Sequence, residues 1–193
     1  FSLPAGAEAG GVGSGTEAYF SHDSGELHLV QLDSADSDLT PGSPMLTWLA
    51  ADLAAKTRPW TIVAFHHPPY TKGTHDSDNP ADSDGLMQRM REHVLPILEA
   101  HGVDLVLTGH SHGYERSFLI RGHYGTTGTF APATMLLHGG DGDPAGDGAM
   151  ARLLGDFVGL EGAVDYKNED LGGDVELKSW PVTASLMIYP IPV

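Results

Sequence analysis

The sequence contains no cysteine, which excludes disulfides and zinc–thiolate sites. Any metal ion must therefore be held by imidazole, carboxylate, amide or phenol groups. Basic side chains are also scarce, since 10 Lys and Arg stand against 26 Asp and Glu, giving a formal net charge of -16. Such a charge repels nucleic acid and anionic membranes, so we expect neither as a partner. No apolar run reaches the length of a membrane span.

The length of 193 residues suits one ordinary domain and is too short for two domains of typical size. A hydrophobic content of 40%, with 25 Gly and 13 Pro, is typical of a globular, loop-rich α/β protein. The chain opens on Phe1 and shows no signal-peptide pattern, so we expect it to be a piece of something longer.

Two elements are predicted in the first third of the chain. Turn residues at 23–25 separate apolar stretches at 17–22 and 26–33, which predicts a β-hairpin. Ser43-Pro44 reads as an N-cap followed by proline at the first helical position. Apolar residues then recur at helical spacing, which predicts a helix to about Lys56.

A strand–helix–strand unit follows. Short apolar runs at 60–65 and 103–108 flank a helical pattern at 85–100, in which Pro96 should cause a kink or a restart. Strands joined in this way should be parallel, with a right-handed crossover. Weaker patterns predict strands at 117–120, 174–178 and 182–189 and a short helix at 149–160.

Histidines follow both strands of this unit. His66 comes directly after the first strand, and His110 and His112 follow the second. Ligands collect beyond the carboxyl ends of parallel strands, and imidazole is a general ligand for first-row metals. We therefore expect these three imidazoles to converge on one small volume. The long polar loop between the first strand and the helix contains His75.

These motifs carry a family resemblance. Val63-Ala64-Phe65-His66 and Gly109-His110-Ser111-His112 resemble the last two of five short motifs in calcineurin-like metallophosphoesterases. The wider context is similar to the purple acid phosphatase branch of that superfamily, in the residues His66-His67-Pro68-Pro69-Tyr70 and Gly113-Tyr114-Glu115-Arg116-Ser117.

The resemblance implies a layered β-sandwich flanked by helices and a two-metal centre that hydrolyses small phosphate esters. It implies that His66 and His110 bind one metal, that His112 binds the other, and that His75 is catalytic and lies near the leaving group. The metals would be iron, zinc or manganese. The likeness also implies a secreted or periplasmic protein.

The first three metal motifs of that family should precede the hairpin, and they are absent from this sequence. We therefore expect residues 1–125 to be the C-terminal half of a metallophosphoesterase domain, truncated on its N-terminal side, and 126–193 to be a Gly- and Asp-rich segment and tail of unclear fold. The alternative is a non-catalytic, metal-binding remnant or half-domain. Either would leave a sheet edge and apolar area exposed, so we expect self-association or a partner chain that completes the site.

Four further features leave two interpretations each. His67 either orients a metal ligand or is an exposed neighbour. Asp33 is expected to cap a turn, the other possibility being an approach to the metals. Glu115-Arg116 favours a structural ion pair, and Asp141-Gly142-Asp143 favours a flexible acidic loop over a cation site.

Overall fold

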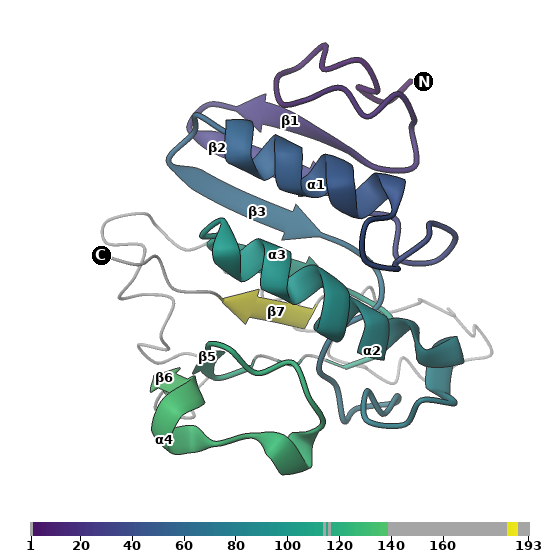
Figure 1. Ribbon diagram of the computed structural model, residues 1–193, viewed down its shortest axis with the longest axis vertical. Helices are drawn as coiled ribbons and strands as arrows, with labels where there is room; N and C mark the ends of the chain where they lie inside the picture. Colours follow the sequence, from purple (N-terminus) through teal and green to yellow (C-terminus); the bar gives the residue numbers. More distant parts are fainter. Residues whose placement is uncertain (1, 114, 116, 139–184, 189–193) are drawn as a thin grey trace, which may run out of the picture.

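The computed structural model describes residues 2–113, 115, 117–138 and 185–188 of the chain, and Figure 1 shows their helices lying across a mixed sheet. In chain order the elements are β1 (Phe20–Ser24), β2 (Leu27–Gln31), α1 (Pro44–Ala55), β3 (Trp60–Ala64), the 3-10 turn η1 (Asp82–Gly85), α2 (Leu86–Arg89), the π turn η2 (Met90–Val94), α3 (Leu95–Ala100), β4 (Leu105–Thr108), β5 (Leu119–Ile120), η3 (Thr127–Thr129), α4 (Pro132–Met135), β6 (Leu136–His138) and β7 (Ser185–Ile188).

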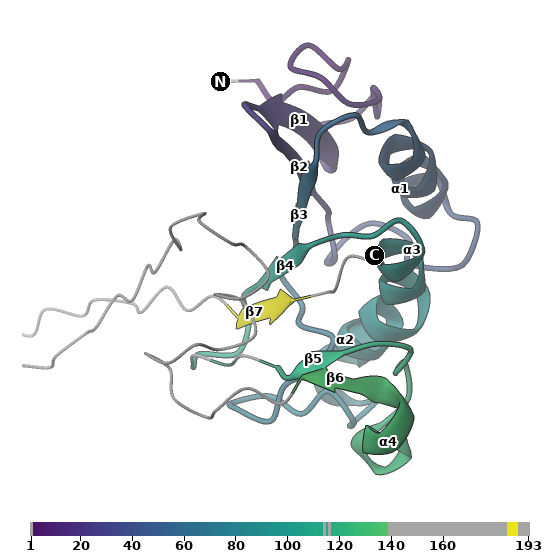
Figure 2. The ribbon, with the colours of Figure 1, turned by 90° about the vertical axis from the view of Figure 1, so that its left-hand side faces the viewer.

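The main sheet has the strand order β1-β2-β3-β4-β7. The three central strands are parallel, and both outer strands run antiparallel to their neighbours. Figure 2 shows α1, α2 and α3 on the same side of this sheet. The predicted α/β class and the parallel strand–helix–strand unit are therefore confirmed.

The face of the sheet under the helices carries the core. Alternate residues of β2, β3 and β4 are buried, in agreement with the two-residue period of a strand. Their valines pack with leucines of α1 and α3, the central set being Val30, Val63, Val106, Leu49, Leu53 and Leu98. Each such side chain contributes roughly 1.5–3 kcal/mol when it is removed from water.

The opposite face of the sheet is apolar but only half-buried. Leu29 lies beside Ile62, and Ile62 lies beside Leu105 in the strand register. Among the described residues, the long helices cover one face only (Figure 2), and the second sheet is the small β5–β6 pair. A sheet that is apolar on both faces suits a layered fold in which each face packs against something.

The predicted hairpin is present, but its turn lies further along the chain. The strands pair as far as Ser24 and Leu27, so Gly25 and Glu26 form the two-residue loop. Gly25 has φ +58°, a left-handed conformation that glycine adopts without steric cost. Asp23, which was expected in the turn, is therefore a strand residue opposite His28.

Helix α1 starts at Pro44 as predicted, but Ser43 does not cap it through its side chain. The Ser43 hydroxyl is buried and has no hydrogen-bond partner among the described residues. The first turn is held by the main chain instead, because the N–H of Thr47 donates to the carbonyl of Ser43 at 2.9 Å.

The helical pattern at 85–100 is interrupted where proline requires it. Pro96 lies in the first turn of α3, and the π turn η2 precedes it. Proline has no N–H to donate and its ring crowds the preceding turn, so a widened turn relieves both problems. The predicted restart at this proline is confirmed.

Only some of the elements predicted beyond residue 120 lie within the described residues. β7 falls within the strand predicted at 182–189, whereas the predicted helix at 149–160 and strand at 174–178 lie outside the described residues. β5 and β6 lie on opposite sides of the expected boundary at residue 125 and pair with each other. The division of the chain into 1–125 and 126–193 stays a prediction. No described helix is long and apolar enough to cross a membrane.

Candidate metal centre

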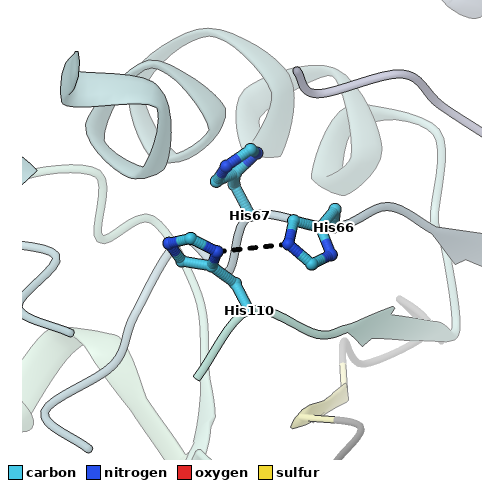
Figure 3. A group of neighbouring side chains, drawn as sticks. All are labelled: His66, His67 and His110. Atoms are coloured by element: carbon cyan, nitrogen blue, oxygen red, sulfur yellow. Dashed lines mark hydrogen bonds between the residues drawn. The ribbon is translucent and has the colours of Figure 1, made fainter. Parts of the chain in front are cut away.

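Two histidines meet at the carboxyl ends of β3 and β4. The main-chain ladder continues past both strands, because Phe65 N–H donates to Leu107 O at 3.1 Å and Gly109 N–H to His66 O at 3.0 Å. These bonds hold the two strand ends side by side. As a result His66 Nε2 lies 3.1 Å from His110 Nδ1 (Figure 3).

The backbone at His110 is in the left-handed region, with φ +68°. A non-glycine residue pays for this conformation roughly 1–2 kcal/mol, and such residues cluster at functional sites. Here the conformation turns the chain sharply after Gly109 and directs the imidazole of His110 towards His66.

His67 is the third imidazole of this group, and it is only 7% exposed. Its Nδ1 lies 2.9 Å from Ser34 Oγ, and its main-chain N–H donates to the same hydroxyl at 3.0 Å. The interpretation of His67 as an exposed neighbour is therefore wrong. His66, His67 and His110 form a group whose nitrogen atoms lie within 4.8 Å of one another, and Figure 3 shows the three rings gathered together.

The surroundings of His110 and His67 favour their neutral forms. Burial, followed by the positive charge of the three neighbouring imidazoles, lowers the pKa of His110 to about 4. Burial and the charge of His66 also lower the pKa of His67. Because metal ions bind the neutral imidazole, the lowered pKa values of His110 and His67 favour the form that a metal ion requires.

His75 approaches the same group from the long loop after β3. Its ring stacks on that of His110, with centroids 3.9 Å apart and planes inclined by 24°. Asp82 holds His75 in place, since Asp82 Oδ1 lies 2.9 Å from His75 Nδ1 and Asp82 Oδ2 accepts the N–H of Asp76 at 2.8 Å. The main-chain bond from Asp76, then His75 and Ser83, lowers the pKa of Asp82 to about 2.

His75, Asp82 and His110 form a second group of donor atoms within 4.8 Å. A metal ion lies near the plane of each imidazole that binds it, and two nearly parallel stacked rings share no such point. In this arrangement the second group is therefore better suited to a hydrogen-bonded chain than to joint coordination by both rings.

His112 belongs to neither group. Its side chain is exposed, and its main-chain N–H donates to Thr74 Oγ1 at 3.1 Å. The structure thus brings together two of the three histidines that were expected to converge, and the role of His112 as a ligand stays a prediction. Asp33 also lies outside both groups. It accepts the N–H of Ala35 and the hydroxyl of Ser37, so its interpretation as a turn cap is confirmed.

The loop that carries His75 is anchored by a residue that the sequence analysis missed. Arg91 of the π turn is fully buried and donates to the carbonyls of Pro69 and Ser77 at 3.1 and 3.0 Å. Its guanidinium also lies 5.7 Å from the ring centroid of Tyr70. A lone arginine among the apolar positions of a helix was the signal that could have revealed this anchor.

Glu115 fixes the same loop from the other side. It accepts the hydroxyl of Thr71 at 2.5 Å and the N–H of Lys72 at 3.0 Å. Its expected partner Arg116 lies outside the described residues, so the predicted ion pair stays a prediction, as does the Asp141-Gly142-Asp143 loop.

Replacing Gly109 by alanine should weaken metal binding with a small loss of stability. A Cβ at this position would lie 3.2 Å from His66 Nδ1, so the imidazole would have to shift by a few tenths of an ångström. We expect the affinity for zinc to fall ~10-fold, as for other changes behind a ligand. Isothermal titration measures it.

Gly113→Ala is the matched control, because a Cβ at Gly113 meets no atom of the described residues within 4 Å. Equal zinc affinities for the two alanine variants would contradict the role of Gly109 as the residue that leaves room for His66.

Comparison with known proteins identifies the family. The family model described as calcineurin-like phosphoesterase matches residues 3–114. Among curated proteins of Arabidopsis thaliana, purple acid phosphatase 18 is 38% identical over 108 residues, which are 54% of this chain and 23% of that protein. Purple acid phosphatase 22 is 36% identical over 107 residues, 53% of this chain and 23% of that protein.

A third relative from the same plant is named as an inactive member of the same group. Probable inactive purple acid phosphatase 9 is 32% identical over 123 residues, which cover 60% of this chain and 18% of that protein. The chain therefore spans about a quarter or less of the length of these relatives.

Proposed function

Because this chain belongs to the calcineurin-like phosphoesterase family, we propose that it supplies part of the metal centre of a phosphate-ester hydrolase. The observation that carries the proposal is the approach of His66 Nε2 to His110 Nδ1 at 3.1 Å, at the ends of adjacent parallel strands. Two imidazole nitrogens that face each other at the ends of adjacent parallel strands can supply half of a four-ligand metal coordination sphere.

In this proposal His66 and His110 hold one metal ion and His112 holds a second. The donor set fits iron or zinc, for which imidazole is a suitable ligand, and manganese where carboxylates join it. Two such ions supply Lewis acidity to the phosphoryl oxygens and offset the repulsion between a phosphate and a protein of formal charge -16.

His75 is the proposed proton donor to the leaving group. Asp82 Oδ1 accepts a hydrogen bond from Nδ1–H of His75, so the imidazole of His75 presents its Nε2 for proton transfer. The stack on His110 keeps His75 beside the proposed metal ligands, the place where a general acid for the leaving group is needed.

The second candidate function is a metal-binding half-domain without catalytic activity. The specific observation that favours it is the composition of the first donor group, which contains three histidines and no carboxylate among the described residues. A bridging carboxylate is what brings two dications close together, so without one a single bound ion is the expected stoichiometry.

Metal content separates these proposals and tests the ligands. The purified protein that contains this chain, equilibrated with zinc, manganese or iron, should retain metal in elemental analysis, and His110→Ala should lower the content. His101→Ala is the control, because His101 Nδ1 lies 2.8 Å from the carbonyl of Ile97, at the end of α3. Two ions per chain would support the dinuclear centre and one would support the half-domain, whereas unchanged content in His110→Ala would refute both.

A further inference from the structure

Three consecutive residues of η1 have left-handed backbone conformations, and two of them are not glycine. Ser83 has φ 51° and ψ 38°, Asp84 has φ 52° and ψ 28°, and Gly85 has φ 72°. L-residues rarely adopt this region, and runs of it persist only where the surrounding contacts hold them. This backbone conformation places the hydroxyl of Ser83 beside His110, with Ser83 Oγ 2.7 Å from His110 Nε2.

The direction of the hydrogen bonds follows from proton counting. Ser83 Oγ also lies 2.8 Å from Asp82 Oδ1, and an ionised carboxylate can only accept. The single hydroxyl proton of Ser83 is therefore donated to Asp82. At its other contact the hydroxyl must accept, so His110 carries its proton on Nε2 and its Nδ1 is unprotonated.

That unprotonated nitrogen is the one that faces His66. The chain of bonds from His110 Nε2–H to Ser83 and on to Asp82 lies on the far side of the ring from His66 Nε2. Partners of this kind orient metal-binding histidines and fix their tautomer in many metal sites.

We propose that Ser83, oriented by Asp82, is a positioning residue that fixes the Nε2–H tautomer of His110 and so presents Nδ1 to a metal ion. The part of this inference that concerns the metal rests on the proposed function. The part that concerns the tautomer stands on the described contacts alone, and the two can be tested separately.

Two glycine variants form a matched pair. Ser83→Gly and Asp84→Gly each replace a left-handed L-residue by glycine, which adopts this conformation without steric cost, so each should keep the turn. Only Ser83→Gly removes the hydroxyl at His110. Asp84 is exposed, and its main-chain carbonyl, which accepts from Arg89, is retained in the variant.

The tautomer is read from the imidazole ¹⁵N chemical shifts of the metal-free protein. We expect the Nε2–H form of His110 to dominate in the wild-type chain and in Asp84→Gly, and a mixture of tautomers in Ser83→Gly. The affinity for zinc should fall ~10–100-fold in Ser83→Gly and stay unchanged in Asp84→Gly.

The outcomes distinguish the role of Ser83 in fixing the tautomer of His110 from the proposed metal-binding function. The same tautomer population in both glycine variants would overturn the inference, whatever the metal affinity. If the tautomer changes in Ser83→Gly while no form of the chain binds zinc, iron or manganese, the positioning role stands and the proposed metal function fails. A zinc affinity that falls equally in both variants would also overturn the inference, because it would assign the effect to the turn and not to the hydroxyl.

Discussion

Replacing Asp52 by alanine is expected to lower the free energy of unfolding by about 3–5 kcal/mol, which is the usual effect of breaking a buried charged pair. Asp52 is fully buried in α1. Its Oδ2 lies 2.8 Å from His28 Nε2, and its Oδ1 accepts the hydroxyl of Ser21 and the N–H of Val12, both at 2.7 Å. Alanine would leave the buried side chains of His28 and Ser21, and the half-buried N–H of Val12, without this partner.

His28 is held between two carboxylates. Its Nδ1 lies 2.9 Å from Asp23 Oδ1, while its Nε2 contacts Asp52, so both ring nitrogens are placed to donate and the imidazolium form satisfies both. Burial alone would lower the pKa of His28, but the hydrogen bonds and negative charges of Asp52 and Asp23 outweigh it and raise the pKa. Arg58 balances the outer carboxylate through a 2.9 Å contact with Asp23.

The sign of the pH dependence follows from this raised pKa. A histidine whose pKa is higher in the folded state contributes its full stabilisation below the pKa of the unfolded chain, ~6.5. The contribution is then lost as the pH rises through the folded-state value. Asp23 acts in the opposite direction, because its pKa is lowered in the folded state by His28 and Arg58, against the effect of burial. Its contribution is lost as the pH falls through that lowered value.

Urea unfolding of the wild-type chain, Asp52→Ala and Asp36→Ala measures these effects at a series of pH values. Asp36 is exposed in the loop after β2, so its replacement removes the same charge from a strongly acidic chain without breaking a buried contact. Equal midpoints for the two variants would contradict the structural role of Asp52. A wild-type stability that rises between about pH 6.5 and 8 would contradict the raised pKa of His28.

The parts of the fold that sequence could predict are those set by local periodicity. Short apolar runs before His66 and His110 predicted two strands, and the helix between them required those strands to be parallel. Parallel strands of one sheet end on the same side, so these two residues were expected near each other, although the left-handed backbone that turns His110 towards His66 was not predicted. The structure confirms their proximity at 3.1 Å.

The contacts around the site could not be predicted in the same way. Asp52 and His28 are separated by 24 positions and Ser83 and His110 by 27, and no local period relates such pairs. The left-handed turn at Ser83 is also invisible to propensity, because serine normally avoids that conformation and only the surrounding contacts hold it there.

The position of His112 was predicted only in part. His112 was expected to converge with His110, but its side chain is exposed and belongs to neither donor group, two residues after the left-handed backbone of His110, so its role as a ligand stays a prediction. Sequence spacing specifies neighbouring residues, whereas a positive φ decides which way each side chain leaves the turn.

Replacing His75 by alanine is expected to lower kcat by ~10²-fold or more for phosphate esters with poor leaving groups, the usual contribution of a general acid. Esters with good leaving groups, such as p-nitrophenyl phosphate, should be spared, because their leaving oxygen needs no proton. The measurement is kcat for an alkyl phosphate and for p-nitrophenyl phosphate, in the protein that contains this chain. Metal content should stay unchanged, because His75 lies on a loop and stacks on the proposed ligand His110. His101→Ala serves again as the control, and an equal loss for both esters would mean that His75 is not the proton donor.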